Sequence, residues 1–395
     1  MSWQEWIMND IIRLLLKLIK AALNNEACDV PENTDWDMLY NAAKYHSLTG
    51  LISYAVESCK DVPPQILESF RQDQMVSIYR EANQEVMAQQ AIDGMEATGI
   101  DCMPLKGFIL KHMYPSVDMR DMCDVDILIH EGDIEAIKPV MAEVGFTYEK
   151  ESPHEFVFSS KLVTIELHKC LVSPYNKDLY AYYGDGWRTA RPKPGYKHVS
   201  EMSPEDFYVY TIAHLAKHYI NSGAGIKQVA DVYVLRQKQT DLDYDYIDEQ
   251  LAQIGIKKFH SILCELIDVW FGDGKFSEAT AQMSDYIIDS GTFGTAVNHN
   301  NSLIYKASED GDYSKAKRGF FVSVLFPPCK VVAKRYPVLD KHPWLYPFVN
   351  VFRWFDVVIN RHEKIKTGLA KTHMDNEGVS RFEQICSAAG LSRTL

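Results

Sequence analysis

The sequence predicts an α+β protein in which a small mixed β-sheet is flanked by an N-terminal and a C-terminal helical region. Residues 1–98 have apolar positions at helical spacing and no strand-like alternation. Residues 99–167 alternate short apolar runs with helix-length segments and end in a cluster of strand-like runs. Helical spacing returns after Ser203. We therefore expect an N-terminal helical region (1–98), an α/β core (99–200) and a C-terminal helical domain (201–395).

The N-terminal region begins with an apolar run between residues 11 and 19 that Arg13 and Lys17 interrupt. The run is too short and too charged for a membrane-spanning helix, and it lacks the shape of a signal peptide. We expect an amphipathic helix packed on the protein, with an interfacial membrane helix or a partner-binding helix as the alternatives. Asp35 is a candidate cap for the next helix, and Gly99 ends a long helical stretch over 64–97.

The core begins with an apolar run over 100–105, which Lys106-Gly107 closes. A helix-length piece (108–113), a second apolar run (125–129) and a helix over 134–144 that ends at Gly145 follow. Three short runs rich in β-branched and aromatic residues complete the sheet, at 146–148, 155–158 and 162–167. Residues 170–200 are rich in Pro, Gly and Tyr without helical periodicity, so we expect a functional loop or lid there.

The C-terminal domain has a clear start at Ser203-Pro204, where a capping hydroxyl precedes a proline at the first helical position. We expect helices from there to the end, with a break at Phe326-Pro327-Pro328. Aromatic residues are frequent over 336–355. Because few basic residues accompany them, we expect these side chains to pack between helices and not to stack on bases.

Composition excludes several classes of protein. The 395 residues are 46% hydrophobic and 24% charged, which is typical of globular chains and excludes disorder as the main state. The net charge of −13 argues against nucleic acid as a partner. Eight scattered cysteines without a C-x-x-C pair indicate thiols in a reducing cytoplasm and offer no zinc site. P-loop, dinucleotide-binding and serine-hydrolase motifs are absent from the sequence.

One pattern points to chemistry. Asp124 and Asp126 lie two residues apart at the start of an apolar strand, so their carboxylates project from the same side about 7 Å apart. Such a pair is costly to desolvate unless a hard cation such as Mg²⁺ (or Mn²⁺) lies between the carboxylates. Glu166 shares a strand face with His168 and completes a three-carboxylate cluster if the two strands pair. An isolated D-x-D arises by chance, and the strand context is what favours a metal site.

The residues around this pattern carry a resemblance to a known family. They are Leu105-Lys106-Gly107, Tyr114-Pro115, Arg120, Asp124-x-Asp126 with Ile127-Leu128-Ile129, Glu166-Leu167-His168, His214, His218, Gly225-Ile226-Lys227-Gln228, Asp231, 290–294, 325–327 and 335–337. From about residue 35 to 355 the chain resembles the uncharacterised bacterial nucleotidyltransferase family of the polymerase-β-like superfamily. The resemblance implies a nucleotidyltransferase core in the sheet region. The superfamily's Gly-Ser or Gly-Gly turn is replaced here by Lys106-Gly107-Phe108.

The remaining candidates surround the three acids. Lys106, Gly107 and Arg120 are candidate nucleotide-binding residues; Arg120 has neutralisation of Asp121 or Asp124 as its alternative role. Candidate cleft-lining residues are His168, His214, His218, Lys227 and Asp231. The i, i+4 spacing of His214 and His218 also suits zinc, but the glutamate of a metalloprotease motif is missing. We expect Asp231 to hydrogen-bond to a histidine.

The sequence therefore predicts a metal-dependent nucleotidyltransferase that moves a nucleoside monophosphate from an NTP, such as ATP, to a hydroxyl or phosphate of a small molecule or protein. Asp124, Asp126 and Glu166 would hold the metals, and Glu166 would help deprotonate the acceptor. Two alternatives stay open: a catalytically inactive nucleotide- or partner-binding module on the same scaffold, and a D-x-D metal-dependent glycosyltransferase. The identity of the acceptor and the oligomeric state do not follow from the sequence.

Overall fold

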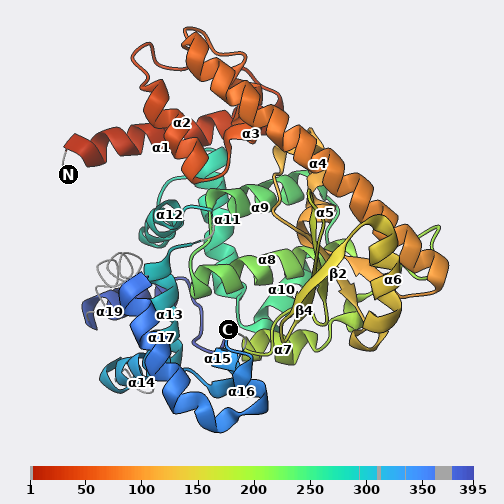
Figure 1. Cartoon of the computed structure of the whole chain (residues 1–395). Coiled ribbons are helices and arrows are strands. Elements are labelled where there is room, and N and C mark those ends of the chain that lie inside the picture. The colour runs from red at the N-terminus through yellow and green to blue at the C-terminus, as the bar shows by residue number, and fades with distance from the viewer. Residues whose placement is uncertain (1–2, 293, 309–312, 334, 361–375) are drawn as a thin grey trace.

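The computed structural model describes residues 3–292, 294–308, 313–333, 335–360 and 376–395 (Figure 1). The N-terminal region is helical, as predicted: α1 (Trp3–Asn24), α2 (Trp36–Tyr45), α3 (Thr49–Val56) and α4 (Pro64–Thr98). The Asp35 side chain accepts a hydrogen bond from the Met38 amide and caps α2. Gly99 ends α4 in the left-handed conformation, with φ 75°. Both sequence signals are confirmed.

The next part of the chain forms a five-stranded sheet with short helices between the strands. Its strands are β1 (Cys102–Pro104), β2 (Val125–Ile129), β3 (Thr147–Glu151), β4 (Glu155–Ser159) and β5 (Thr164–His168). The sheet order is β1-β2-β5-β4-β3, with β2 and β5 parallel and the other neighbours antiparallel. The short helices are α5 (Lys106–Leu110) and α6 (Ile134–Val144). The predicted α+β fold with a small mixed sheet is confirmed.

The C-terminal part is helical wherever the structure describes it. Ser203 caps α8 by accepting a hydrogen bond from the Asp206 amide, as its sequence predicts. The chain breaks before Pro327-Pro328, as expected. The helices are α8 (Pro204–Asn221), α9 (Ile226–Lys238), α10 (Tyr244–Ile254), α11 (Lys257–Phe271), α12 (Glu278–Ser290), α13 (Ala296–Ala307), α14 (Tyr313–Leu325), α15 (Cys329–Ala333), α16 (Val338–Lys341), α17 (Tyr346–Asn360) and α19 (Asn376–Ala388).

The sheet separates two hydrophobic cores because its strands alternate. Val125, Ile127 and Ile129 of β2 pack with apolar residues of α4 and α6 on one side of the sheet. Leu128 points the other way and joins a larger core that includes α1, α3, α8 and α9. Figure 1 shows α4 and α6 beside the strands, with α8 and α9 in the middle of the molecule. The face of β2 that carries Asp126 and Leu128 is therefore turned toward the C-terminal helices.

The first helix is part of the larger core. Leu15, Leu18 and Ile19 of α1 are completely buried, and α1 packs against α3 and α11. The prediction of a packed helix is confirmed, and the interfacial alternative is wrong for this segment. In the part of the chain that the structure describes, no helix has both the length and the apolar character to cross a bilayer. The proposed domain boundaries stay a prediction.

Two expectations about local structure are wrong. The segment 170–200 is not a plain loop, because it contains α7 (Lys177–Tyr183) and a two-stranded ribbon of β6 (Arg191–Pro192) and β7 (Ser200–Glu201). Buried Leu179 and Tyr183 give α7 an i, i+4 pair, which is too short a pattern to separate from a loop. The C-terminal aromatics do not all pack inward: four of them, Trp344, Phe348, Phe352 and Phe355, are 62–69% exposed.

A buried ion pair joins the start of the core to the C-terminal helices. Arg120 donates from Nε and Nη2 to the two carboxylate oxygens of Asp231 on α9, each at 2.8 Å. The Tyr114 hydroxyl donates to the same carboxylate at 2.7 Å. The side chains of Arg120 and Asp231 are only 12% and 4% exposed. The expectation that Asp231 hydrogen-bonds to a histidine is therefore wrong. The expectation that Arg120 neutralises Asp121 or Asp124 is also wrong, because its partner is Asp231.

Removing one member of this pair leaves a buried charge without its partner. We expect Asp231→Ala to lower the free energy of unfolding by about 3–5 kcal/mol in urea denaturation. Glu57→Ala is the matched control, because it breaks the exposed Arg71–Glu57 pair. That change should cost no more than about 1 kcal/mol. Equal losses in the two variants would contradict the role given to Asp231.

Candidate functional site

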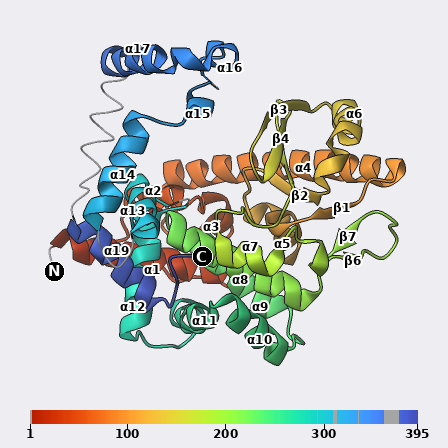
Figure 2. The same ribbon diagram turned by 90° about the horizontal axis from the view of Figure 1, so that it is seen from below.

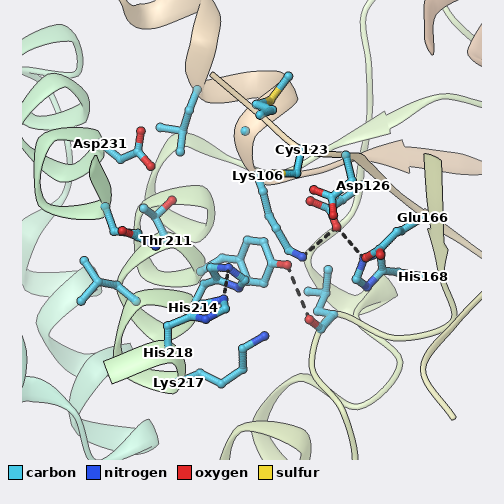
Figure 3. A pocket seen from close by; sticks show the side chains of 18 of the residues that line it. Lys106, Cys123, Asp126, Glu166, His168, Thr211, His214, Lys217, His218 and Asp231 are labelled. Carbon is cyan, nitrogen blue, oxygen red and sulfur yellow. Dashed lines mark hydrogen bonds and ion pairs between the residues drawn. The ribbon is translucent and has the colours of Figure 1, made fainter. Parts of the chain in front are cut away.

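A cavity of about 320 Å³ lies between the sheet and helices α8 and α9 (Figure 3). One wall comes from the sheet and the segments before it, and the other from the C-terminal helices. Every candidate residue of the sequence analysis lines it: Lys106, Gly107, Arg120, Asp124, Asp126, Glu166, His168, His214, His218, Lys227 and Asp231. The structure thus brings together side chains from segments more than 100 residues apart.

The strand register brings Asp126 and Glu166 together, whereas Asp124 lines the same cavity without belonging to a potential metal group of the described residues. Asp126 of β2 lies directly opposite Glu166 of the parallel neighbour β5, and Asp124 comes just before β2. His168 is two residues beyond Glu166 and shares its face. The carboxylates of Asp126 and Glu166 and the His168 ring each offer a ligand atom within 4.8 Å of the others. The strands that carry Asp126 and Glu166 therefore pair as expected.

Asp126 is the most strongly held acid of the cluster. Its Oδ1 accepts a hydrogen bond from Lys106 Nζ at 2.9 Å and lies 2.7 Å from His168 Nε2. Burial opposes ionisation of Asp126, but Lys106 and His168 outweigh it and hold its pKa well below the ordinary value. Burial and the Lys106 charge lower the pKa of His168. Asp126 is therefore a carboxylate beside an ammonium and a neutral imidazole.

The other two acids experience the opposite effect. Burial raises the pKa of Asp124, and the nearby charge of Asp126 raises it further. For Glu166, burial and the charges of Asp124 and Glu155 raise the pKa to about 7. These shifts mean that the cavity holds more negative charge than its own cations neutralise at the acid cluster. A divalent cation would relieve that repulsion.

The residues present fit Mg²⁺ or Mn²⁺. Carboxylate oxygens are the ligands that these ions take in proteins, and the open cavity leaves room for water and phosphate oxygens. His168 Nδ1 is buried and has no hydrogen-bond partner among the described residues. A second group that could hold an ion consists of His154, Glu155 and His168. Because magnesium prefers oxygen ligands, this second group, with its two imidazoles, suits Mg²⁺ less well than the first.

Lys106 stands at a strained turn. Its φ of 47° is left-handed, a conformation that non-glycine residues rarely adopt. The residue is the first of α5, and the turn directs its amine at Asp126 across the cavity (Figure 3). At Gly107 the space is tight: a Cβ would lie 2.5 Å from Arg120 Nη1 and 2.6 Å from Met122 Sδ, so those two side chains would have to shift. Strain of this kind is typical of functional sites.

The histidines of α8 form a pair without a metal-binding third group. Nε2 of His214 and Nε2 of His218 lie 2.9 Å apart. Burial, followed by the Lys217 charge, lowers the pKa of both rings, to about 3 for His218. Neither ring belongs to a potential metal cluster in the described ranges. They therefore line the cleft as neutral side chains, and the zinc alternative gains no support.

Sequence reasoning missed several residues of the cavity. Lys217 reaches into it from α8, opposite Lys106, and has no ion-pair or hydrogen-bond partner among the described residues (Figure 3). Burial and the Lys106 charge lower the pKa of Lys217 to about 7. Helical spacing would have found it, since positions 210, 214, 217 and 218 share one face of α8. Cys123 also lines the cavity, as an exposed thiol.

Glu155 is a fourth carboxylate at this site. It is the first residue of β4 and pairs in register with His168. A hydrogen bond from His154 lowers the pKa of Glu155 to about 2, so this acid stays ionised. No sequence pattern singled it out, because one acid at the first position of a short strand is common.

The comparison with known families adds to this geometry. Residues 32–272 match the family described as uncharacterised nucleotidyltransferase. The chain belongs to this nucleotidyltransferase family. The match covers both walls of the cavity, and the predicted class of enzyme is confirmed at the level of the family. The segments 290–294 and 325–337, which also carried the resemblance, lie beyond the match.

Other comparisons add little. A search of curated proteins gives no significant match. Among solved structures, the chain is similar to the solution structure of the antibiotic-resistance factor ANT(2″)-Ia, with 9% sequence identity and a TM-score of 0.33. The similarity covers 44% of this chain and 91% of that one. A TM-score of this size does not establish a common fold.

The lowered pKa of Lys217 makes stability depend on pH. Between about pH 7 and pH 10 this amine is protonated in the unfolded chain and neutral in the folded chain. The free energy of unfolding therefore rises with pH in that window. We expect Lys217→Met to be more stable than the natural chain by about 2–4 kcal/mol at pH 6.5, with the difference shrinking as the pH approaches 10. Urea denaturation at several pH values measures it. Lys60→Met, at an exposed position, is the control. A pH-independent difference for Lys217→Met would contradict the buried-charge account.

Proposed function

We propose that the chain is a Mg²⁺- or Mn²⁺-dependent nucleotidyltransferase that transfers a nucleoside monophosphate from an NTP to a hydroxyl or phosphate of a small molecule or protein. The observation that carries the proposal is the register of β2 and β5, which places Asp126 beside Glu166 in a cavity that Asp124 and three lysines also line. Acidic clusters of this kind serve phosphoryl transfer, because bound metal ions neutralise charge on the leaving pyrophosphate and activate the attacking oxygen.

The chain's own residues then have distinct roles. Asp124, Asp126 and Glu166 would supply the carboxylates of the metal site. The acceptor oxygen forms a bond to the α-phosphorus as the bond to the bridging oxygen breaks and pyrophosphate leaves. Glu166 would also help to accept the acceptor's proton.

The cations of the cavity suit the triphosphate. Lys106 neutralises Asp126 in this structure. Once that carboxylate binds a metal, the ammonium would turn to the phosphates. Lys217 lies opposite with no carboxylate to satisfy it, so a phosphate oxygen would restore its charge. Arg120 would act through its pair with Asp231, by fixing the wall of the cavity. His168, His214, His218 and Lys227 complete the lining.

Asp126→Asn tests the metal site. We expect the natural chain to bind an NTP at least about tenfold more tightly with Mg²⁺ than with EDTA, because the metal links Asp126 to the phosphates. In Asp126→Asn this ratio should fall close to one, as measured by calorimetry. Asp133→Asn, at a partly buried acid that does not line the cavity, should keep the full ratio. Equal metal dependence in both variants would remove Asp126 from the metal site.

An inactive nucleotide-binding module is the second candidate. It is favoured by the ion pair of Lys106 with Asp126, which already neutralises the central acid without a metal. Release of pyrophosphate from an NTP in a screen of acceptors separates the two functions. A cytoplasmic location is part of the first proposal, because the eight cysteines are free thiols and fit a reducing compartment.

A further inference from the structure

The exposed side chains of α17 are apolar over the residues whose exposure the structure describes, 346–356. Five exposed residues follow helical spacing along α17 and the turn before it: Trp344, Phe348, Val351, Phe352 and Phe355. Their exposed fractions run from 45% for Val351 to 69% for Trp344 and Phe348. We name these five residues the aromatic face. Single exposed apolar residues are ordinary, but a contiguous row of four aromatic rings marks an interaction surface.

The polar side of α17 faces inward and fixes this orientation. Asn350 Nδ2, Arg353 Nη2 and Trp354 Nε1 all donate to the backbone oxygen of Leu325, at 3.1, 2.7 and 2.9 Å. The Trp354 ring also packs edge-on against Phe326. Rotating α17 to bury the aromatic face would break all three hydrogen bonds. The exposure of the aromatic rings is therefore built into the packing of the helix.

The surrounding unit is small and stands apart from the rest of the fold. Val332, Ala333 and Leu339 form its own core, separate from the two larger hydrophobic cores. Figure 2 shows α15, α16 and α17 beyond the end of α14, away from the sheet. A core of only three buried side chains gives this unit little folding stability of its own. A contact between the unit and a partner would therefore explain its position.

The charge of this unit is opposite to that of the chain. Residues 329–360 contain five lysines and arginines and two aspartates, whereas the whole chain has a net charge of −13. Lys330 and Lys341 are exposed, on α15 and α16. A net positive charge on a unit that also exposes aromatic side chains is typical of surfaces that bind anionic membranes.

We propose that the aromatic face docks on an anionic lipid bilayer, with the exposed Lys330 and Lys341 of the same unit as its cationic contacts. The aromatic rings would enter the headgroup region and the lysines would contact lipid phosphates, without any segment crossing the membrane. A nucleic acid fits less well, because its backbone needs cations on the contact face itself, and that face here is apolar. A second copy joined through the same face would bring two positively charged units together.

Vesicle binding by the full chain tests the proposal. We expect co-sedimentation with vesicles of phosphatidylcholine and phosphatidylglycerol, and much weaker binding to phosphatidylcholine alone. Phe348→Ser/Phe352→Ser should weaken binding at least about tenfold, because two aromatic rings that would be buried in the membrane are lost. Lys330→Glu/Lys341→Glu should weaken it at least about fivefold. Met75→Ser/Tyr79→Ser, which removes two exposed apolar side chains of α4, is the matched control and should bind like the natural chain.

A spectroscopic measurement keeps the test independent of folding. The tryptophan emission should shift to the blue when anionic vesicles are added, and Trp344→Phe should lose most of that shift while keeping vesicle binding. Lack of binding to anionic vesicles would overturn the proposal. So would a concentration-dependent dimer in lipid-free solution that Phe348→Ser/Phe352→Ser abolishes, because the face would then join two copies. Nucleotide affinity should be the same in all these variants, which separates this proposal from the proposed catalytic function.

Discussion

The parallel pairing of β2 with β5 in one register is the constraint on which the site depends. Val125 and Ile127 of β2 and Ile165 of β5 are buried against α4 and α6, so these strands cannot rotate or slip. The same alternation sets Asp126 beside Glu166 on the opposite face. A slip of one residue would exchange the two sets, placing carboxylates in the hydrophobic core. Packing on one face of the sheet thus determines the chemistry on the other.

Placing these acids close together costs electrostatic free energy, and the chain's own side chains offset only part of it. Lys106 and His168 stabilise Asp126, whereas the pKa values of Asp124 and Glu166 stay raised. Lys106 reaches Asp126 from a left-handed backbone conformation. Burial raises the pKa of Glu166 first, and the neighbouring carboxylates raise it further. The proposed metal ion would offset the repulsion between these carboxylates.

The sequence allowed the strands and the shared face of the acids to be predicted, because alternation is a local property. Long-range partners escaped prediction. Asp231 pairs with Arg120 from 111 residues away, and Lys217 faces Lys106 only because α8 packs against the sheet. The helix α7 is too short to give a period. The exposure of Phe348 was not predicted, because an apolar helix face is expected to be buried. The hydrogen bonds on the inner side of α17 hold the helix with this face outward.

The most direct test of the central claim is a crystal structure of the full chain with a non-hydrolysable NTP and Mn²⁺, using the anomalous signal of manganese. The account predicts a manganese peak at coordination distance from the carboxylates of Asp126 and Glu166, with the amine of Lys106 moved from Asp126 to a phosphate oxygen. A nucleotide bound in this cavity with Lys106 still on Asp126, or manganese away from both carboxylates, would contradict it.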